Sequence, residues 1–173
     1  MTMLKDYTQN REAILALLPR MFEIIAQNMR EIAPTGNTLE EDRKSWTQAM
    51  LAELNKPEKR WVMAFDRNEQ LVGYVLYRIH GATLHMDEIQ VAKTRQGDGK
   101  IFPGLLGKLL RDGVDADVIT LCSHANKHNE KSQGILQALG LRPVKELPRG
   151  LCYEGGFDDA FAWFRGKYSC KKE

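Results

Sequence analysis

The sequence predicts an α/β fold whose mixed sheet combines an antiparallel meander with one βαβ crossover. Three strand-like segments between residues 60 and 92 are separated by short turns, and neighbouring strands joined in this way run antiparallel. A helical segment, 100–111, then leads into an apolar strand, 117–122, expected to be buried and parallel to the preceding strand. The length of 173 residues fits one domain, residues 1–173.

Composition and charge indicate an ordinary soluble globular protein, because 43% of the residues are hydrophobic and 28% are charged. A net charge of +2 is too small to indicate nucleic acid or an anionic membrane as a partner. No apolar run reaches membrane-spanning length, and the N-terminus lacks a signal-peptide core. Cys122, Cys152 and Cys170 are scattered without CxxC spacing, which suits a reducing compartment, so we expect a cytoplasmic protein.

The N-terminal segment predicts a short strand followed by a broken helix. Residues 3–9 give a weak strand signal, and Asn10 is a suitable N-cap for a helix over 11–18. Proline lacks a backbone N–H and is tolerated mainly in a first helical turn, so Pro19 predicts that a second helical piece, 20–32, starts there.

A capping box predicts the next helix, over residues 39–54. Thr38 is the N-cap, and Glu41 can accept a hydrogen bond from the backbone N–H of the N-cap. Trp46, Met50 and Leu54 follow at four-residue spacing, so they share one face, which we expect to be mainly core.

The remaining strands follow from apolar segments between turn residues. Gly73 interrupts the second strand of the meander, where a glycine marks a bulge or a close backbone approach. The expected strands are 60–65, 70–80, 83–92, 117–122 and 151–157, and residues 158–167 are expected to form a closing helix or a partner-facing segment.

The chain is organised around a strand, a glycine turn and an amphipathic helix, all within residues 86–110. Glu88 and Gln90 share one face of the strand, opposite Asp87. The turn 96–100 reads Gln-Gly-Asp-Gly-Lys and leads into a helix N-terminus. Unpaired N–H groups and the helix dipole favour an anion there, and Lys100 adds positive charge. The turn is neither a Walker loop nor a three-glycine dinucleotide motif, and such a glycine pair often marks only a turn.

A second segment carries Asn129, Ser132 and a helix that ends at Gly140, a suitable C′ residue. Together, the two segments resemble the signature motifs of the GCN5-related N-acetyltransferases, the GNAT family. Residues 96–101 fit the loop Q/R-x-x-G-x-G/A, with Ile101 where the family has a small residue. Asn129 and Ser132 fit N-x-x-A/S. The resemblance covers residues 60–142 and implies a GNAT-like mixed central sheet with helices on both faces.

The resemblance implies that acetyl-coenzyme A is the co-substrate. The loop would hold its pyrophosphate, and the exposed backbone of 89–91 would hold the pantetheine arm, with an N–H facing the thioester oxygen. Asn129 would bond the arm or the loop, and Ser132 would lie beside the pyrophosphate or the adenosine end. The implied cofactor-binding residues are Ile89, Gln90, Val91, Gln96, Gly97, Asp98, Gly99, Lys100, Ile101, Phe102, Asn129 and Ser132.

Acetyl transfer to a primary amine in a ternary complex calls for a base, because an amine with a pKa of about 10.4 is mostly protonated at neutral pH. Glu88 is the candidate base, since several family members carry a carboxylate on this strand; a salt-bridged surface carboxylate is the alternative. The family's usual tyrosine acid falls at Leu136, so Tyr153 is the candidate acid. Cys122 and His124 are further candidates for this acid. Each of the three residues can instead have a purely structural role.

Other readings of the same residues remain open. A GNAT-like domain could bind coenzyme A as a sensor or interaction module without catalysis, and an unrelated α/β domain could use the glycine pair only as a turn. His124 and His128 lack the spacing of a ligand set, so no metal site is expected. In the family the first helices line the acceptor pocket, which makes Trp46 a candidate for contact with a small-molecule or peptide amine. A homodimer is expected because dimers are common in the family.

Overall fold

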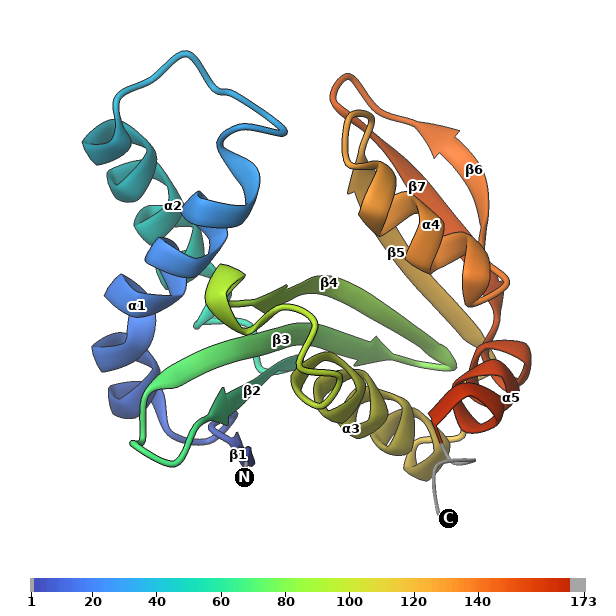
Figure 1. Ribbon diagram of the computed structural model, residues 1–173. Coiled ribbons are helices and arrows are strands. Elements are labelled where there is room, and N and C mark those ends of the chain that lie inside the picture. The colour runs from blue at the N-terminus through green and yellow to red at the C-terminus, as the bar shows by residue number, and fades with distance from the viewer. Residues whose placement is uncertain (1, 169–173) are drawn as a thin grey trace. The chain divides into compact units, whose positions relative to one another are not determined.

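The computed structural model describes residues 2–168, which form a seven-stranded mixed sheet and five α-helices (Figure 1). The strand order is β1-β2-β3-β4-β5-β7-β6. Along the chain the elements are β1 (Met3–Asp6), α1 (Arg11–Met29), α2 (Leu39–Glu53), β2 (Lys59–Phe65), β3 (Leu71–His80), β4 (Thr83–Val91), the 3₁₀-helix η1 (Lys93–Arg95), α3 (Ile101–Asp115), β5 (Thr120–Asn126), α4 (Glu130–Ala138), β6 (Arg142–Glu146), β7 (Gly150–Gly156) and α5 (Phe157–Tyr168). The predicted mixed sheet is confirmed, and Cys170 lies outside the described residues.

The chain divides into two compact units, which are described separately. The first contains the residues up to Leu76 together with Glu88–Leu106, and the second contains Tyr77–Asp87 together with the residues from Gly107 onward. The expectation of one domain over residues 1–173 stays a prediction. Within the described part of the chain, no helix combines the length and the apolar character needed to cross a membrane.

The first unit is built around α1 and the strands that it covers. Its core contains Ile14, Leu18, Met21, Ile24, Trp61, Met63, Phe65, Leu71, Tyr74, Leu76 and Ala92. The predicted face of α2, with Trp46, Met50 and Leu54, packs against this core and is partly buried. The predicted capping box is confirmed, because Glu41 N donates to Thr38 Oγ1 at 3.2 Å and Thr38 N donates to Glu41 Oε2 at 2.8 Å.

The predicted break at Pro19 is wrong, because α1 runs unbroken from Arg11 to Met29 with Pro19 inside it. Pro19 lies on the exposed face, so water can satisfy the carbonyl that its missing N–H leaves unbonded. Leu18 and Met21, on the two sides of the proline, are both buried against the sheet. Burial on the opposite face therefore outweighs the local helix-breaking signal.

Helices cover both faces of β3, as the sequence predicts. A Cβ added at Gly73 would lie 2.8 Å from the Gln90 oxygen and 2.9 Å from Ile101 Cγ2 at the start of α3. The hydroxyl of the next residue, Tyr74, lies 3.5 Å from the Met21 oxygen of α1. Successive strand residues point to opposite faces, so α3 begins on one face of β3 and α1 lies on the other. The close approach expected at Gly73 is confirmed.

In the second unit, β5 pairs in parallel with β4, from Thr83 opposite Thr120 to Met86 opposite Ser123. The expected strand at 117–122 starts three residues too early and ends too soon. Asp117 has a left-handed φ of 54°, and the side chain of Ile119 is 70% exposed. The strand continues through polar residues to Asn126 because it pairs antiparallel with β7. The end of an apolar run therefore did not mark the end of this strand.

The last strand in the sheet order is β6, an edge strand that pairs antiparallel with β7 and was not predicted. All five of its residues are exposed, so it carries no apolar alternation. Its register shifts between Pro143 and Lys145, and the side chain of Val144 at that point is 60% exposed. The predicted last strand and closing helix correspond to β7 and α5.

Candidate active site

Glu88 lies on β4, is partly buried, and receives a short hydrogen bond from the Tyr74 hydroxyl. Burial and the neighbouring Glu88 carboxylate raise the pKa of Tyr74 well above its ordinary value. Tyr74 therefore keeps its proton at neutral pH and acts as the donor. A phenol that donates to a carboxylate stabilises its charged form, which is the form that a general base needs before it takes a proton.

Asn28 of α1 joins the end of β4 to the start of the glycine loop. Its Nδ2 donates to Gln90 Oε1 and to the Val91 oxygen, both at 2.9 Å. Gln96 Nε2 donates in turn to Asn28 Oδ1 at 2.9 Å and to the Val91 oxygen at 3.1 Å. The structure thus brings the predicted residues Gln90, Val91 and Gln96 together. Sequence reasoning missed Asn28. The signal that could have found it is a polar amide at a position that lies in line with the apolar stripe of α1.

The glycine loop forms a turn, as its sequence suggests, and both glycines are left-handed, with φ of 90° at Gly97 and 73° at Gly99. However, Asp98 Oδ1 accepts hydrogen bonds from Lys100 N at 3.0 Å and from Ile101 N at 3.3 Å. An aspartate side chain can accept hydrogen bonds from the backbone N–H groups two and three residues ahead, so this side chain already satisfies N–H groups that were expected to be unpaired. Any phosphate that uses these groups must displace the Asp98 carboxylate.

Ile101 departs from the small residue of the family pattern, and its environment explains the difference. Its side chain is 0% exposed and packs toward Gly73 of β3. Phe102 is half-buried, whereas Lys100 is exposed. Ile101 is thus a core residue of the first unit, and its backbone N–H is the part that takes part in the loop.

In the second unit, the Asn129 side chain caps α4 by accepting a hydrogen bond from Ser132 N at 3.1 Å. Tyr153 is 1% exposed, and its hydroxyl donates to Gln133 Oε1 at 3.5 Å. The Gln133 amide also donates to the Lys127 oxygen at 2.9 Å. Leu136, where the family has its tyrosine, is buried. The pattern did not single out Gln133, whose partner Tyr153 lies 20 residues away in the sequence.

The candidate thiol of Cys122 shows no sign of reactivity. Burial, reinforced by the nearby Glu154 carboxylate, raises the pKa of the Cys122 thiol to about 11, and its Sγ lies 3.6 Å from Glu154 Oε2. The thiol is therefore protonated at neutral pH and is a poor nucleophile. Within residues 2–168, no group of three or more His, Cys, Asp or Glu side chains is placed to hold a metal ion.

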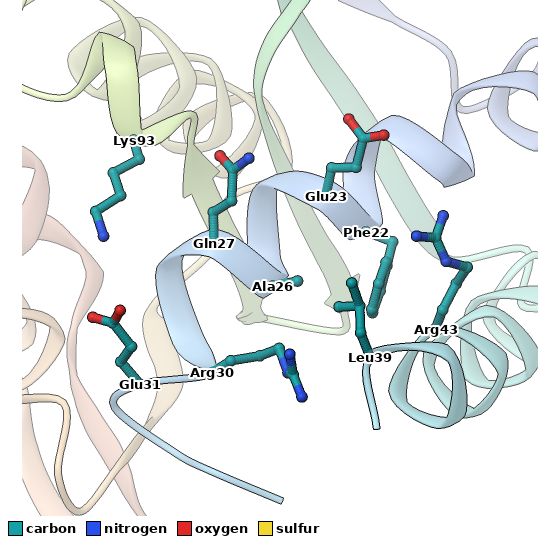
Figure 2. A pocket seen from close by; sticks show the side chains of 9 residues that line it. All are labelled: Phe22, Glu23, Ala26, Gln27, Arg30, Glu31, Leu39, Arg43 and Lys93. Atoms are coloured by element: carbon teal, nitrogen blue, oxygen red, sulfur yellow. The ribbon is translucent and has the colours of Figure 1, made fainter. Parts of the chain in front are cut away.

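The first unit also contains an open pocket of about 430 Å³ between α1, α2 and Lys93 (Figure 2). The Arg43 guanidinium lies over the buried Phe22 ring, 5.2 Å from its centre. Figure 2 shows these two residues at one end of the pocket and Lys93 and Glu31 at the other. The pocket is lined by Phe22, Glu23, Ala26, Gln27, Arg30, Glu31, Leu39, Arg43 and Lys93.

No protein-family model matches the sequence, and no curated protein matches it either. Solved structures do match. An acetyltransferase of the GNAT family from Staphylococcus aureus is 15% identical, with 91% of this chain and 99% of that chain covered and a TM-score of 0.69. The PaiA N-acetyltransferase of Thermoplasma acidophilum, in complex with coenzyme A, is 13% identical over 89% of this chain and 99% of that chain, with a TM-score of 0.68.

A third solved structure is a spermidine N-acetyltransferase chimera from Vibrio cholerae and hSSAT. It is 14% identical over 92% of this chain and 98% of that chain, with a TM-score of 0.62. These likenesses show that the chain has the GNAT fold, as the two sequence motifs suggested.

Proposed function

We propose that the chain is an N-acyltransferase that moves an acetyl group from acetyl-CoA to a primary amine by direct transfer in a ternary complex. One observation carries the proposal: β4 bears Glu88, a carboxylate bound by Tyr74, and leads within a few residues to a left-handed glycine loop at the start of α3. Acyl transfer from a carrier to an amine needs a base and an anion-binding loop. The acetyltransferase neighbours, one of them in complex with coenzyme A, support this choice of co-substrate.

The residues of the loop fit a pyrophosphate. A Cβ added at Gly97 or Gly99 would meet nothing within 4 Å, so the outer side of the loop is open. The N–H groups there and the exposed Lys100 would bind the pyrophosphate once Asp98 moves aside. The backbone of 89–91 would carry the pantetheine arm. In the second unit, Asn129 and Ser132 at the start of α4 remain the residues proposed to contact acetyl-CoA.

Glu88 would take a proton from the acceptor's ammonium group, and the free amine would attack the thioester carbonyl carbon. A backbone N–H of the 89–91 segment would donate to the oxyanion of the tetrahedral intermediate. The C–S bond then breaks, the thiolate leaves with the electron pair, and the proton that the attacking nitrogen loses in becoming the amide goes to the departing thiolate. A thiol with a pKa of about 8.5 leaves tolerably without an acid. Tyr153 remains the candidate acid, although its hydroxyl is buried and donates to Gln133.

Two measurements test the proposal. The first is the thermal unfolding midpoint with acetyl-CoA, CoA and ATP in parallel, where a ligand at 100 times its dissociation constant adds about 2.7 kcal/mol of stability. The second is thiol release across a panel of amines. Glu88→Gln should lower kcat by about 10²- to 10⁴-fold while the acetyl-CoA shift stays unchanged. A kcat equal to that of the unsubstituted protein at every pH would remove Glu88 as the base.

A second candidate function is a coenzyme-A-binding module without catalysis. Two observations favour it: Leu136 is buried where the family has its acid, and Asp98 occupies two N–H groups of the loop. A thermal shift with CoA but no thiol release with any amine would support this candidate over the enzyme.

A further inference from the structure

We propose that the pocket between α1 and α2 holds the acceptor by a carboxylate, and that Arg43 is the residue that selects it. The acceptor class would then be amines that carry a carboxylate, such as amino acids or short peptides. This inference rests on the proposed function and specifies its substrate. It begins from two buried donor groups that have no acceptor in the described structure.

The two donors are Arg43 Nε and Trp46 Nε1. Both atoms are shielded from solvent and have no hydrogen-bond acceptor among residues 2–168. They lie three residues apart on α2 and flank one ring, since Phe22 is 5.2 Å from the Arg43 guanidinium and 5.8 Å from the Trp46 ring. Buried N–H groups are nearly always bonded. Arg43 lines the pocket and Trp46 does not, so the unbonded Arg43 Nε is the donor that calls for a partner oxygen there.

Among the residues that the structure describes, Arg43 has one ionic neighbour, and this neighbour leaves the guanidinium open to the pocket. Glu40 Oε2 lies 3.4 Å from Arg43 Nε, but the two atoms do not form a hydrogen bond, and the Glu40 side chain is 82% exposed. The terminal nitrogens of Arg43 have no acceptor in the described part of the chain. A guanidinium presents a planar fork that matches a carboxylate with two parallel hydrogen bonds. The Phe22 ring holds that fork in place from one side.

The other charges of the pocket are either paired or lie at its far end. Arg30 is bonded to Asp42 at 3.2 Å, and Glu23 to Arg20 at 2.8 Å. Lys93 and Glu31 point toward one another at the end opposite Arg43 (Figure 2). One end is therefore cationic and the other carries both signs, which suits a ligand with a carboxylate at one end and a cationic or amide group at the other. A polyamine would place like charges beside Arg43, so the pocket disfavours it.

The pocket and the proposed base flank the same stretch of α1. The Tyr74 hydroxyl that binds Glu88 lies 3.5 Å from the oxygen of Met21, the residue before Phe22. Further along α1, Asn28 follows the pocket residue Gln27 and is bonded to the end of β4. An acceptor held in the pocket therefore lies against the segment of α1 that contacts the proposed catalytic strand.

The test compares each amino acid with its amide and with its decarboxylated amine, for example lysine, lysinamide and cadaverine. Binding is measured by calorimetry on the full chain, and kcat/KM by thiol release. Arg43→Met should weaken binding and lower kcat/KM for the carboxylate form by about 10- to 100-fold, with little change for the amide and the amine. Arg43→Lys keeps the charge but not the planar fork. Its kcat/KM for the carboxylate form should therefore fall between the values of the unsubstituted protein and of Arg43→Met.

Lys44→Met is the matched control, because Lys44 is the exposed neighbour of Arg43 and does not line the pocket. It should leave the carboxylate preference intact. Tighter binding of the amide or the diamine to the unsubstituted protein, or an equal loss for all three forms in Arg43→Met, would overturn the inference. The CoA-induced thermal shift reports on the proposed function separately, since calorimetry of the free amino acid needs no turnover.

Discussion

Replacing Asp98 by asparagine should tighten coenzyme A binding. In the unliganded protein, the Asp98 carboxylate accepts hydrogen bonds from Lys100 N at 3.0 Å and Ile101 N at 3.3 Å. A pyrophosphate bound by the same N–H groups would meet this negative charge. An asparagine side-chain oxygen can accept the same two hydrogen bonds, so Asp98→Asn removes the charge and keeps these bonds.

Two terms set the size of the effect. At a separation of about 5 Å in water, two unit charges interact by roughly 0.8 kcal/mol, and physiological salt screens about half of that. A diphosphate with two charges therefore gives a repulsion of about 1 kcal/mol, or about fivefold in Kd. Asp98→Ala also removes these hydrogen bonds, which costs the free protein about 1 kcal/mol of folding stability and adds a similar gain in CoA affinity.

The assay is calorimetric titration of CoA at low and at physiological salt, together with urea unfolding of the free proteins. The gain of Asp98→Asn should shrink as salt is added, because the side chain is 31% exposed. Asp158→Asn is the charge-matched control, since Asp158 lies in the first turn of α5 and belongs to the second unit. Weaker CoA binding by Asp98→Asn at both salt concentrations would refute the competition between carboxylate and pyrophosphate.

Three further predictions follow from the geometry. Gly73→Ala should destabilise the fold by about 1–3 kcal/mol, because its Cβ would lie 2.8 Å from the Gln90 oxygen; urea unfolding measures this, and an unchanged midpoint would contradict the packing. Alkylation of Cys122, followed by mass spectrometry, should rise with pH toward a midpoint of about 11, because only the thiolate reacts; a plateau near pH 8 would contradict the effect of burial. Tyr74→Phe should move the acid limb of the pH–rate profile to higher pH, since Glu88 loses a donor that favours its charged form. An acid limb at an unchanged pH would contradict the role of the Tyr74 hydroxyl in stabilising the Glu88 carboxylate.

Features that depend on neighbours in sequence could be predicted. The capping box at Thr38 and Glu41 needs only the spacing of the two residues, and it formed as expected. The turn at Gly97 and Gly99 and the close approach at Gly73 follow from residue type. The order of strands and helices, read through the two motifs, was enough to predict the GNAT fold.

Features that depend on distant partners could not be predicted. Pro19 stays within α1 because burial on the opposite face holds the helix, and β5 extends to Asn126 because β7 pairs with it. The tie from Asn28 to Gln96 joins residues 68 apart in the sequence. The meeting of Arg43 with Phe22 likewise required the packing of α2 on α1, which no local pattern contains.

The edge strand β6 affects how copies of the chain can meet. An edge strand offers unpaired backbone groups to any other chain, and sheets limit this with proline, lysine and bulges. β6 carries all three devices, with Pro143, Lys145 and the register shift between them. Another copy would therefore find a poor template for extending the sheet along β6. The composition and register shift of β6 therefore disfavour the edge-to-edge strand pairing that leads to aggregation.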